Sequence, residues 1–268
     1  MMRKAVILAR GLGRRMRALT PGYHLNASQE AVAETGLKAM MPFERPFLDY
    51  SLSALADAGF EEACLVIGPE HVLVRTHYTT TPPHRIRVGF ALQAEPLGTA
   101  NAVLAAEEFA LNEHFLTINS DNYYPVSALA RLRSLEEPAA ALFPESTLIR
   151  GGIPPERILK FAICSVSGDG YLSGIVEKPP NGGQGSDHAD RLLSLNCWCF
   201  PPSIFDACRR TPMSLRGEYE LPTAVETAMR DFDVRFRVVV CRDPVLDLSS
   251  RADVATVADK LTGIAANP

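Results

Sequence analysis

The strongest constraint on the fold is an alternation, in the first half of the chain, between short apolar runs and helical patterns. The apolar runs are Lys4–Ala9, Ala63–Ile67, Arg87–Leu92 and Phe115–Ile118, and the helical patterns are Phe47–Ala58 and Thr99–Phe109. Apolar runs of this length, bounded by glycine or polar residues, are typical of buried strands. Because strands and helices alternate, the pattern predicts an α/β fold with a doubly wound, mostly parallel sheet.

The second half of the chain has a different pattern, in which strand-like runs follow one another across turns. These runs are Phe161–Val166, Leu172–Glu177, Leu193–Phe200 and Val234–Cys241, and a helical pattern at Ala252–Leu261 closes the chain. We therefore expect an antiparallel-rich lobe laid over the edge of the first sheet. The 268 residues are interpreted as one domain, 1–268, with a first lobe over about 1–145 and a second over about 146–268.

Composition narrows the classes of partner. The formal net charge is -4, so the broad basic footprint of a nucleic-acid-binding protein is not expected. No apolar run approaches the ~18 residues that a membrane span needs, and no signal peptide is visible. These observations predict a cytoplasmic protein with neither a nucleic acid nor a membrane as partner.

The six cysteines do not form a recognisable metal set. Only Cys197 and Cys199 are close in sequence, and in a strand both would point to the same face. No CxxC pair and no nearby histidine complete a zinc site. We expect reduced, mostly buried thiols.

The stretch "ILARGLGRRM" places two glycines among three arginines directly after a strand. Gly11 and Gly13 would let the backbone approach a phosphate, and Arg15 could bind phosphate oxygens with two parallel N–H groups. A plain strand-to-helix turn remains the alternative, because neither a Walker loop nor the dinucleotide fingerprint is complete. The loop is a candidate triphosphate site.

Two aspartates follow apolar runs and are candidate ligands for one Mg²⁺. Asp121 ends the strand in "FLTINSDNYYP", and Asp247 ends a run in "PVLDLSSRADV". A carboxylate at the end of a strand often holds Mg²⁺ beside a phosphate. The alternatives are an Asx turn at Asp121 and helix capping at Asp247.

The stretch "QAEPLGTA" lies between a strand and a helix, where its polar groups could contact a nucleobase. The Gln93 amide offers one donor and one acceptor, which match the edge of uracil or thymine. Gly98 and the turn before it would form a rigid backbone wall, with Thr99 beside it. The alternative is that Thr99 only caps the helix.

Four further polar residues lie where a ligand could reach them. Lys38 is a lone charge in "TGLKAMMPF", Glu177 and Lys178 end a strand, and Asn196 lies inside the apolar run "LSLNCWCF". A surface lysine, a surface ion pair and a backbone-bonded amide are the alternatives. No histidine pairs with a plausible Ser or Cys nucleophile.

The order of these motifs resembles that of the sugar-1-phosphate nucleotidyltransferases, also called nucleotide-sugar pyrophosphorylases. The matching stretches run from Lys4 to about Leu261, and "FALQAEPLGTANAVLAA" is most similar to the uridylyl- and thymidylyltransferases. The resemblance implies a Rossmann-like core with a sugar-binding lobe. It also implies transfer of UMP or dTMP from UTP or dTTP to a sugar 1-phosphate, with release of pyrophosphate and dependence on Mg²⁺.

The resemblance also implies a role for each matching residue. Gly11, Gly13 and Arg15 would bind the triphosphate, and Lys38 would contact phosphate near the reacting centre. Gln93 and Gly98 would bind the base, Asp121 and Asp247 would hold Mg²⁺, and Glu177, Lys178 and Asn196 would face the sugar phosphate.

The chain departs from the family pattern in three places. Arg10 stands where a small residue is usual, Arg14 where Thr or Ser is usual, and Tyr23–Thr35 is an extra piece. These departures motivate a second hypothesis, a non-catalytic protein that binds a nucleotide or nucleotide sugar and regulates a partner. A cytidylyltransferase acting on a phospho-alcohol and a metal-dependent glycosyltransferase are further alternatives. The sequence identifies neither the sugar nor the oligomeric state, and a homo-oligomer is compatible with it.

Overall fold

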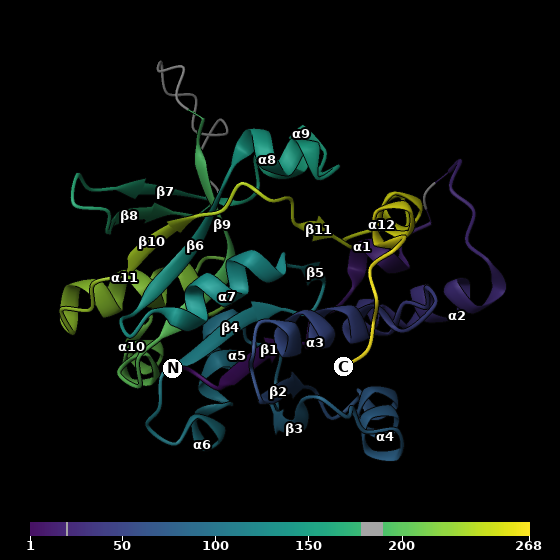
Figure 1. Cartoon of the computed structure of the whole chain (residues 1–268), viewed down its shortest axis with the longest axis horizontal. Helices are drawn as coiled ribbons and strands as arrows, with labels where there is room; N and C mark the ends of the chain where they lie inside the picture. Colours follow the sequence, from purple (N-terminus) through teal and green to yellow (C-terminus); the bar gives the residue numbers. More distant parts are fainter. Residues whose placement is uncertain (20, 178–189) are drawn as a thin grey trace.

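The computed structural model describes residues 1–19, 21–177 and 190–268. Nine strands within these residues form one sheet, in which β10-β6-β9-β4-β1-β2-β3 are neighbours in that order and β7 pairs with both β8 and β9. Figure 1 shows this sheet at the centre of the molecule with helices on both sides. The strands of the sheet are β1 (Lys4–Leu8), β2 (Glu62–Ile67), β3 (Arg87–Leu92), β4 (Phe115–Asn119), β6 (Ala139–Pro144), β7 (Ala162–Val166), β8 (Leu172–Val176), β9 (Leu192–Phe200) and β10 (Arg237–Val240).

The parallel half of the sheet confirms the alternation in the sequence. Strand β1 pairs in parallel with both β2 and β4, and β2 pairs in parallel with β3. The chain adds strands on one side of β1 and then crosses to its other side to form β4. This reversal is a topological switch point, and ligands of such sheets bind outside the carboxyl ends of the strands there.

The second half extends this sheet instead of lying over its edge. Strand β9 pairs antiparallel with β4, β6 and β7. Cys197 and Cys199 pack into the apolar cluster on one face of the sheet, whereas Trp198 packs into the cluster on the other. A strand that is apolar on both faces is stable only inside a covered sheet, which explains its position.

Two helical layers cover the faces. Helices α3 (Phe47–Asp57), α4 (Val72–Thr80) and α7 (Val126–Ser134) pack on one face, and α5 (Thr99–Leu104), α6 (Glu107–Ala110), α10 (Ile204–Arg210) and α11 (Leu221–Asp231) pack on the other. The single helix expected over Thr99–Phe109 is thus two helices. Two short helices, α8 (Glu145–Arg150) and α9 (Pro155–Ile158), follow β6.

A third apolar cluster lies at one end of the molecule, where Figure 1 shows α1, α2 and α12 gathered together. It is built around Met16, Ala33 and Val257. The extra piece of the chain supplies the second of these helices, whose first turn is closed by a capping box between Asn26 and Gln29. The elements of this end are α1 (Arg14–Arg17), α2 (Ala27–Thr35), the 3₁₀ helix η1 (Lys38–Met40), α12 (Asp253–Leu261) and the two-stranded pair β5 (Asn122–Tyr123) and β11 (Leu246–Asp247).

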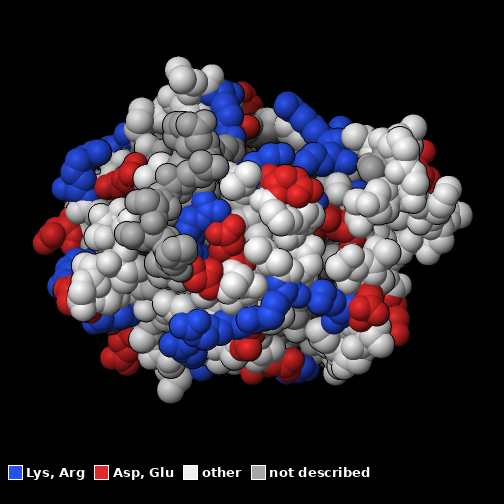
Figure 2. Space-filling view, turned by 90° about the horizontal axis from the view of Figure 1, so that it is seen from above, with Lys and Arg blue, Asp and Glu red and all other residues white. Residues whose placement is uncertain are grey.

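The six cysteines are free and buried, as expected. Figure 2 shows Lys and Arg side chains in a band across one face, with Asp and Glu side chains beside them. Within the described ranges, no helix has the length and apolarity of a membrane span.

Candidate active site

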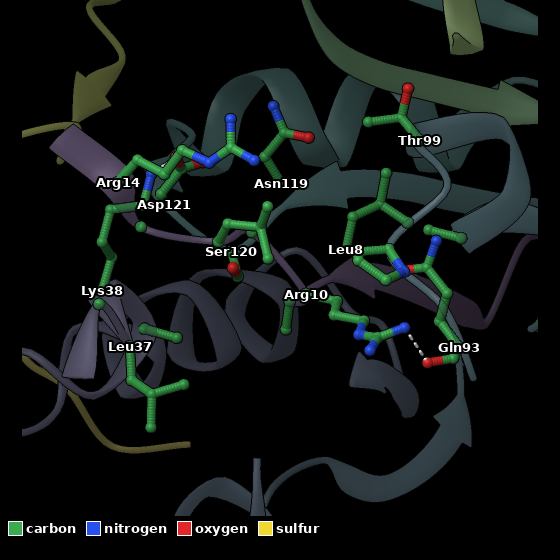
Figure 3. Close-up of a pocket in the computed structure, with 18 of the residues that line it drawn as sticks. Leu8, Arg10, Arg14, Leu37, Lys38, Gln93, Thr99, Asn119, Ser120 and Asp121 are labelled. Atoms are coloured by element: carbon green, nitrogen blue, oxygen red, sulfur yellow. Dashed lines mark hydrogen bonds and ion pairs between the residues drawn. The ribbon is translucent and has the colours of Figure 1, made fainter. Parts of the chain in front are cut away.

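A cavity of about 420 Å³ lies at the switch point of the sheet. The loops that follow β1, β3 and β4 form its walls, and η1 and β9 each add one polar side chain. Figure 3 shows these side chains converging on one space. The sequence-predicted residues that line it are Gly11, Gly13, Arg15, Lys38, Gln93, Gly98, Thr99, Asp121 and Asn196.

The glycine loop is shaped by a close backbone contact. Gly13 has a φ of 60°, and a Cβ atom there would lie 2.2 Å from the main-chain oxygen of Gly36. A Cβ at Gly11, by contrast, would meet no atom within 4 Å. The fold therefore requires glycine at position 13, whereas at position 11 glycine leaves room that a ligand could use.

Two arginines of this loop are exposed and line the cavity. The side chains of Arg14 and Arg15 form no hydrogen bond or ion pair with another described residue. The side chain of Arg14 extends toward Asn119 (Figure 3). Both charges are therefore available to an anionic ligand.

Lys38 and Asp121 come from different elements and form an ion pair. Lys38 begins η1, and Asp121 follows β4 by two residues. The ammonium group donates a hydrogen bond to Asp121 Oδ2, and 12% and 23% of the two side chains are exposed. The pair places one positive and one negative group on the same cavity wall, where phosphate oxygens and a cation could lie side by side.

Asp247 does not line the cavity, although we expected it beside Asp121. Its Oδ1 accepts hydrogen bonds from Asn122 Nδ2 and Ser249 Oγ, and its Oδ2 accepts one from Arg157 at 2.8 Å. Burial and the nearby Asp121 raise the pKa of the Asp247 carboxyl group. The two carboxylates are thus within electrostatic reach of each other.

Sequence reasoning missed Arg157, which also contacts Asp253 at 2.9 Å. Its helix α9 is a single turn without a recognisable motif. Asn119 and Ser120, which also line the cavity, could have been inferred because they directly precede Asp121.

The cavity wall that contains Gln93 and Gly98 differs from the expectation in one respect. The Gln93 Nε2 group donates to the main-chain oxygen of Gly98 at 3.0 Å and to Asn101 Oδ1 at 2.8 Å. Both of its hydrogens are therefore used, and only the Oε1 acceptor remains for a ligand. The expectation that this amide offers a donor as well as an acceptor was wrong.

The residues beside Gln93 are held by contacts with the chain that leads into α11. Gly98 has a φ of 105°, and a Cβ there would lie 2.5 Å from the main-chain oxygen of Tyr219. The Thr99 hydroxyl accepts a hydrogen bond from the main-chain N–H of Leu221 at 2.9 Å. Gly98, and not Thr99, is the N-cap of α5.

Of the residues expected to face the sugar phosphate, Asn196 lines the cavity and Glu177 does not. Asn196 lines the cavity with a φ of 58°, a left-handed conformation that asparagine tolerates, and donates to Asn119 Oδ1. Glu177 does not line it; the carboxylate lies 3.6 Å from Arg216, and burial, reinforced by Glu220, raises the pKa of Glu177 to about 7. Lys178 lies outside the described residues.

A family model described as nucleotidyl transferase matches residues 4–240. The matched span contains the glycine loop, Lys38, Gln93 and Asp121. The chain belongs to the nucleotidyl transferase family. The family inferred from the order of the motifs is thereby confirmed, as is the α/β fold with its mostly parallel sheet.

Relatives in this family differ in the nucleotide that they are named for. The chain is 26% identical over 231 residues to a UTP–glucose-1-phosphate uridylyltransferase of Haloferax volcanii, covering 85% of this chain and 84% of the relative. It is 27% identical to a glucose-1-phosphate thymidylyltransferase of Streptomyces griseus over 83% of this chain, but spans only 56% of that relative. A shorter match, at 30% identity over 46% of this chain and 48% of the relative, is to a heptose 1-phosphate guanylyltransferase of Aneurinibacillus thermoaerophilus.

The fold of a solved UDP-glucose pyrophosphorylase, in complex with UDP-glucose, is similar to that of this family member. The TM-score is 0.75 at 19% identity, over 98% of this chain and 99% of the other. At this identity the likeness concerns the fold alone.

Proposed function

We propose that this protein transfers UMP or dTMP from UTP or dTTP to a sugar 1-phosphate and releases pyrophosphate. The observation that carries the proposal is the convergence, in one cavity, of the glycine loop, the Lys38–Asp121 pair and the Gln93 amide. The names of the uridylyl and thymidylyl relatives support it.

The residues of the cavity suit a direct displacement. An oxygen of the sugar phosphate forms a bond to the α-phosphorus of the nucleotide, and the bond from that phosphorus to the bridging oxygen of pyrophosphate breaks. Both reactants are anionic, so the main barrier is charge repulsion and alignment. Lys38 and Arg15 would neutralise that charge, and no general base is needed because the attacking oxygen is already ionised.

Mg²⁺ fits the chemistry of the residues present. Within the described part of the chain no cluster of three or more His, Cys, Asp or Glu side chains could hold a metal ion. Mg²⁺ bound beside phosphates, however, needs only one or two carboxylates. Asp121 would hold the ion together with substrate oxygens. Asp247 would join it by giving up one of its present hydrogen bonds for a bond to the ion. Bound there, Mg²⁺ would supply positive charge at the phosphates.

A matrix of nucleoside triphosphates against sugar 1-phosphates, with pyrophosphate release as the readout, tests the proposed function. UTP or dTTP with a hexose 1-phosphate should give the fastest release, and Asp121→Asn should abolish it without unfolding the protein. Nucleotide binding without any release would favour the regulator. Release only from CTP with a phospho-alcohol would favour the cytidylyltransferase, although no aromatic side chain among the described residues lines the cavity.

A further inference from the structure

Arg10 occupies a position at which the resembled family has a small residue, and its side chain links the ends of three adjacent parallel strands. It follows β1, whereas its partners Glu70 and Gln93 follow β2 and β3. The guanidinium Nε and one terminal nitrogen contact the two Glu70 oxygens at 3.1 and 3.2 Å. The other terminal nitrogen donates to the main-chain oxygen of Gln93, as Figure 3 shows.

These contacts hold the guanidinium group at the base end of the cavity. The Arg10 side chain is only 6% exposed, yet the residue lines the cavity. A Cβ at Gly68 would lie 2.3 Å from Arg10 Nε, so the pair with Glu70 packs directly on that glycine. Glu70 balances the charge of Arg10. In this respect Arg10 differs from Arg14 and Arg15, whose side chains have no partner among the described residues.

Arg10 still has hydrogen-bond donors to offer. A guanidinium group carries five N–H bonds, and three of them are used by Glu70 and Gln93. The others have no partner within the described residues. Beside them lies the amide of Gln93, whose Nε2 hydrogens are used and whose Oε1 accepts nothing from a described residue. The base end therefore presents a fixed donor next to a fixed acceptor.

Uracil and thymine complement this arrangement, because each has a keto oxygen beside an imino N–H. Cytosine in the same pose would present its exocyclic amino group to the Arg10 donors and a bare ring nitrogen to the Gln93 oxygen, so that two donors and two acceptors would face each other. Guanine presents the same keto–imino pair as uracil, so only its larger size distinguishes it from uracil at this site. We propose that Arg10 is a specificity-determining residue, which donates to a keto oxygen of the base while the neighbouring imino N–H donates to Gln93 Oε1. This inference rests on the proposed function, which supplies the nucleotide.

Binding of UTP and CTP, each titrated calorimetrically into the protein with Mg²⁺ and without a sugar phosphate, tests the inference. The wild type should bind UTP about tenfold or more tightly than CTP, because a lost hydrogen bond to a charged group has about that effect. Arg10→Met, which keeps the length but removes the donors, should lower the ratio several-fold by weakening UTP, and the preference that remains would come from Gln93 Oε1. Arg10→Lys, which keeps a donor and the charge beside Glu70, should give an intermediate ratio.

The matched control is Arg75→Met, on helix α4. Arg75 is exposed, lies over the Phe90 ring at 5.3 Å and does not line the cavity, so both affinities should stay unchanged. Equal weakening of UTP and CTP by Arg10→Met would overturn the inference and leave Arg10 a structural role. Pyrophosphate release, measured in parallel with a sugar 1-phosphate, keeps the two proposals apart. A changed ratio without release would refute only the proposed function, and release with an unchanged ratio would refute only the role of Arg10.

Discussion

At the scale of single residues, the arginines after β1 differ in their surroundings although they are neighbours in sequence. Arg10 is paired with Glu70 and nearly buried, whereas the exposed side chains of Arg14 and Arg15 have no partner among the described residues. Arg17 donates to the main-chain oxygen of Thr35 at 2.9 Å. Only the unpaired arginines can neutralise a triphosphate at no cost to an existing contact. The loop thus combines arginines held by contacts within the protein with unpaired arginines that line the cavity.

Arg15→Ala should reduce kcat/KM for the nucleotide by about a hundredfold, near 3 kcal/mol, because a charge-assisted contact to phosphate is lost. Arg14→Ala should have a smaller effect, since the resembled family has no arginine there. Steady-state kinetics of both variants provide the comparison. A larger loss for Arg14→Ala than for Arg15→Ala would show that Arg14, and not Arg15, makes the main contact to the triphosphate.

Glu177 should make stability depend on pH. Its pKa is raised from 4.5 to about 7 in the fold, by burial first and then by Glu220. The folded chain therefore keeps a proton that the unfolded chain releases, and stability falls as pH rises from about 4.5 to 7. Glu177→Gln lacks this loss, so its stability relative to wild type should rise between pH 5 and pH 8.

Urea unfolding at the two pH values measures this change, which we expect to be on the order of 1 kcal/mol because solvent screens the partly exposed carboxylate. Glu95→Gln, at an exposed glutamate, is the matched control. A difference between Glu177→Gln and wild type that stays constant from pH 5 to pH 8 would contradict the raised pKa.

At the scale of elements, helix α2 is attached to the glycine loop through Arg251. The Arg251 side chain is 4% exposed, donates from Nε to the main-chain oxygen of Met16 at 3.0 Å, and contacts both Glu30 oxygens at 2.6 Å. Met16 belongs to α1, directly after Gly13 and the exposed arginines. The extra piece of the chain therefore supports the loop that would bind the triphosphate.

Glu30→Ala should destabilise the protein by about 1–3 kcal/mol, because it leaves the buried Arg251 guanidinium without its carboxylate. It should also speed amide hydrogen exchange in α1, whose position depends on the same arginine. Urea unfolding and exchange detected by mass spectrometry measure the two effects. Glu34→Ala, on the exposed face of the same helix, should produce neither effect. If exchange in α1 of Glu30→Ala is as slow as in the wild type, α2 does not support the loop.

At the scale of the whole molecule, both halves of the chain share one hydrogen-bonded sheet. Strand β9 joins them, because it pairs with β4 of the first half and with β6 and β7 of the second. Trp198, the only tryptophan, lies in β9 and is buried against Phe200 and Phe236. Loss of either half would thus expose the same aromatic cluster.

We predict that the chain unfolds in one cooperative transition. Tryptophan fluorescence, far-UV circular dichroism and reaction of the six buried thiols with a disulfide reagent should all report the same urea midpoint. Thiols that react before the tryptophan signal changes, or two resolved transitions, would indicate two independently folding domains.

The sequence by itself determined those features of the fold that depend only on residues close together along the chain. The bounds of β3 (Arg87–Leu92) were predicted to the residue, and β1, β2 and β4 to within one residue at either end, because their apolar runs and boundary residues are local signals. The same signals placed the glycine loop and Asp121 beyond the ends of their strands. Most of the candidate site was therefore predictable once the parallel sheet was inferred.

Only the tertiary structure decided which groups each side chain contacts. The Asp247–Arg157 pair, the Arg10–Glu70 pair and the hydrogen bonds that commit the Gln93 amide arise from elements that the fold brings together. Strand β6 (Ala139–Pro144), rich in alanine, was not predicted, because its strand character comes from pairing with β9 and β10. The local pattern of residues indicates whether a segment is buried. The partner of a polar group, however, depends on which segments the fold brings together, because a hydrogen bond requires a donor and an acceptor within a narrow range of distances.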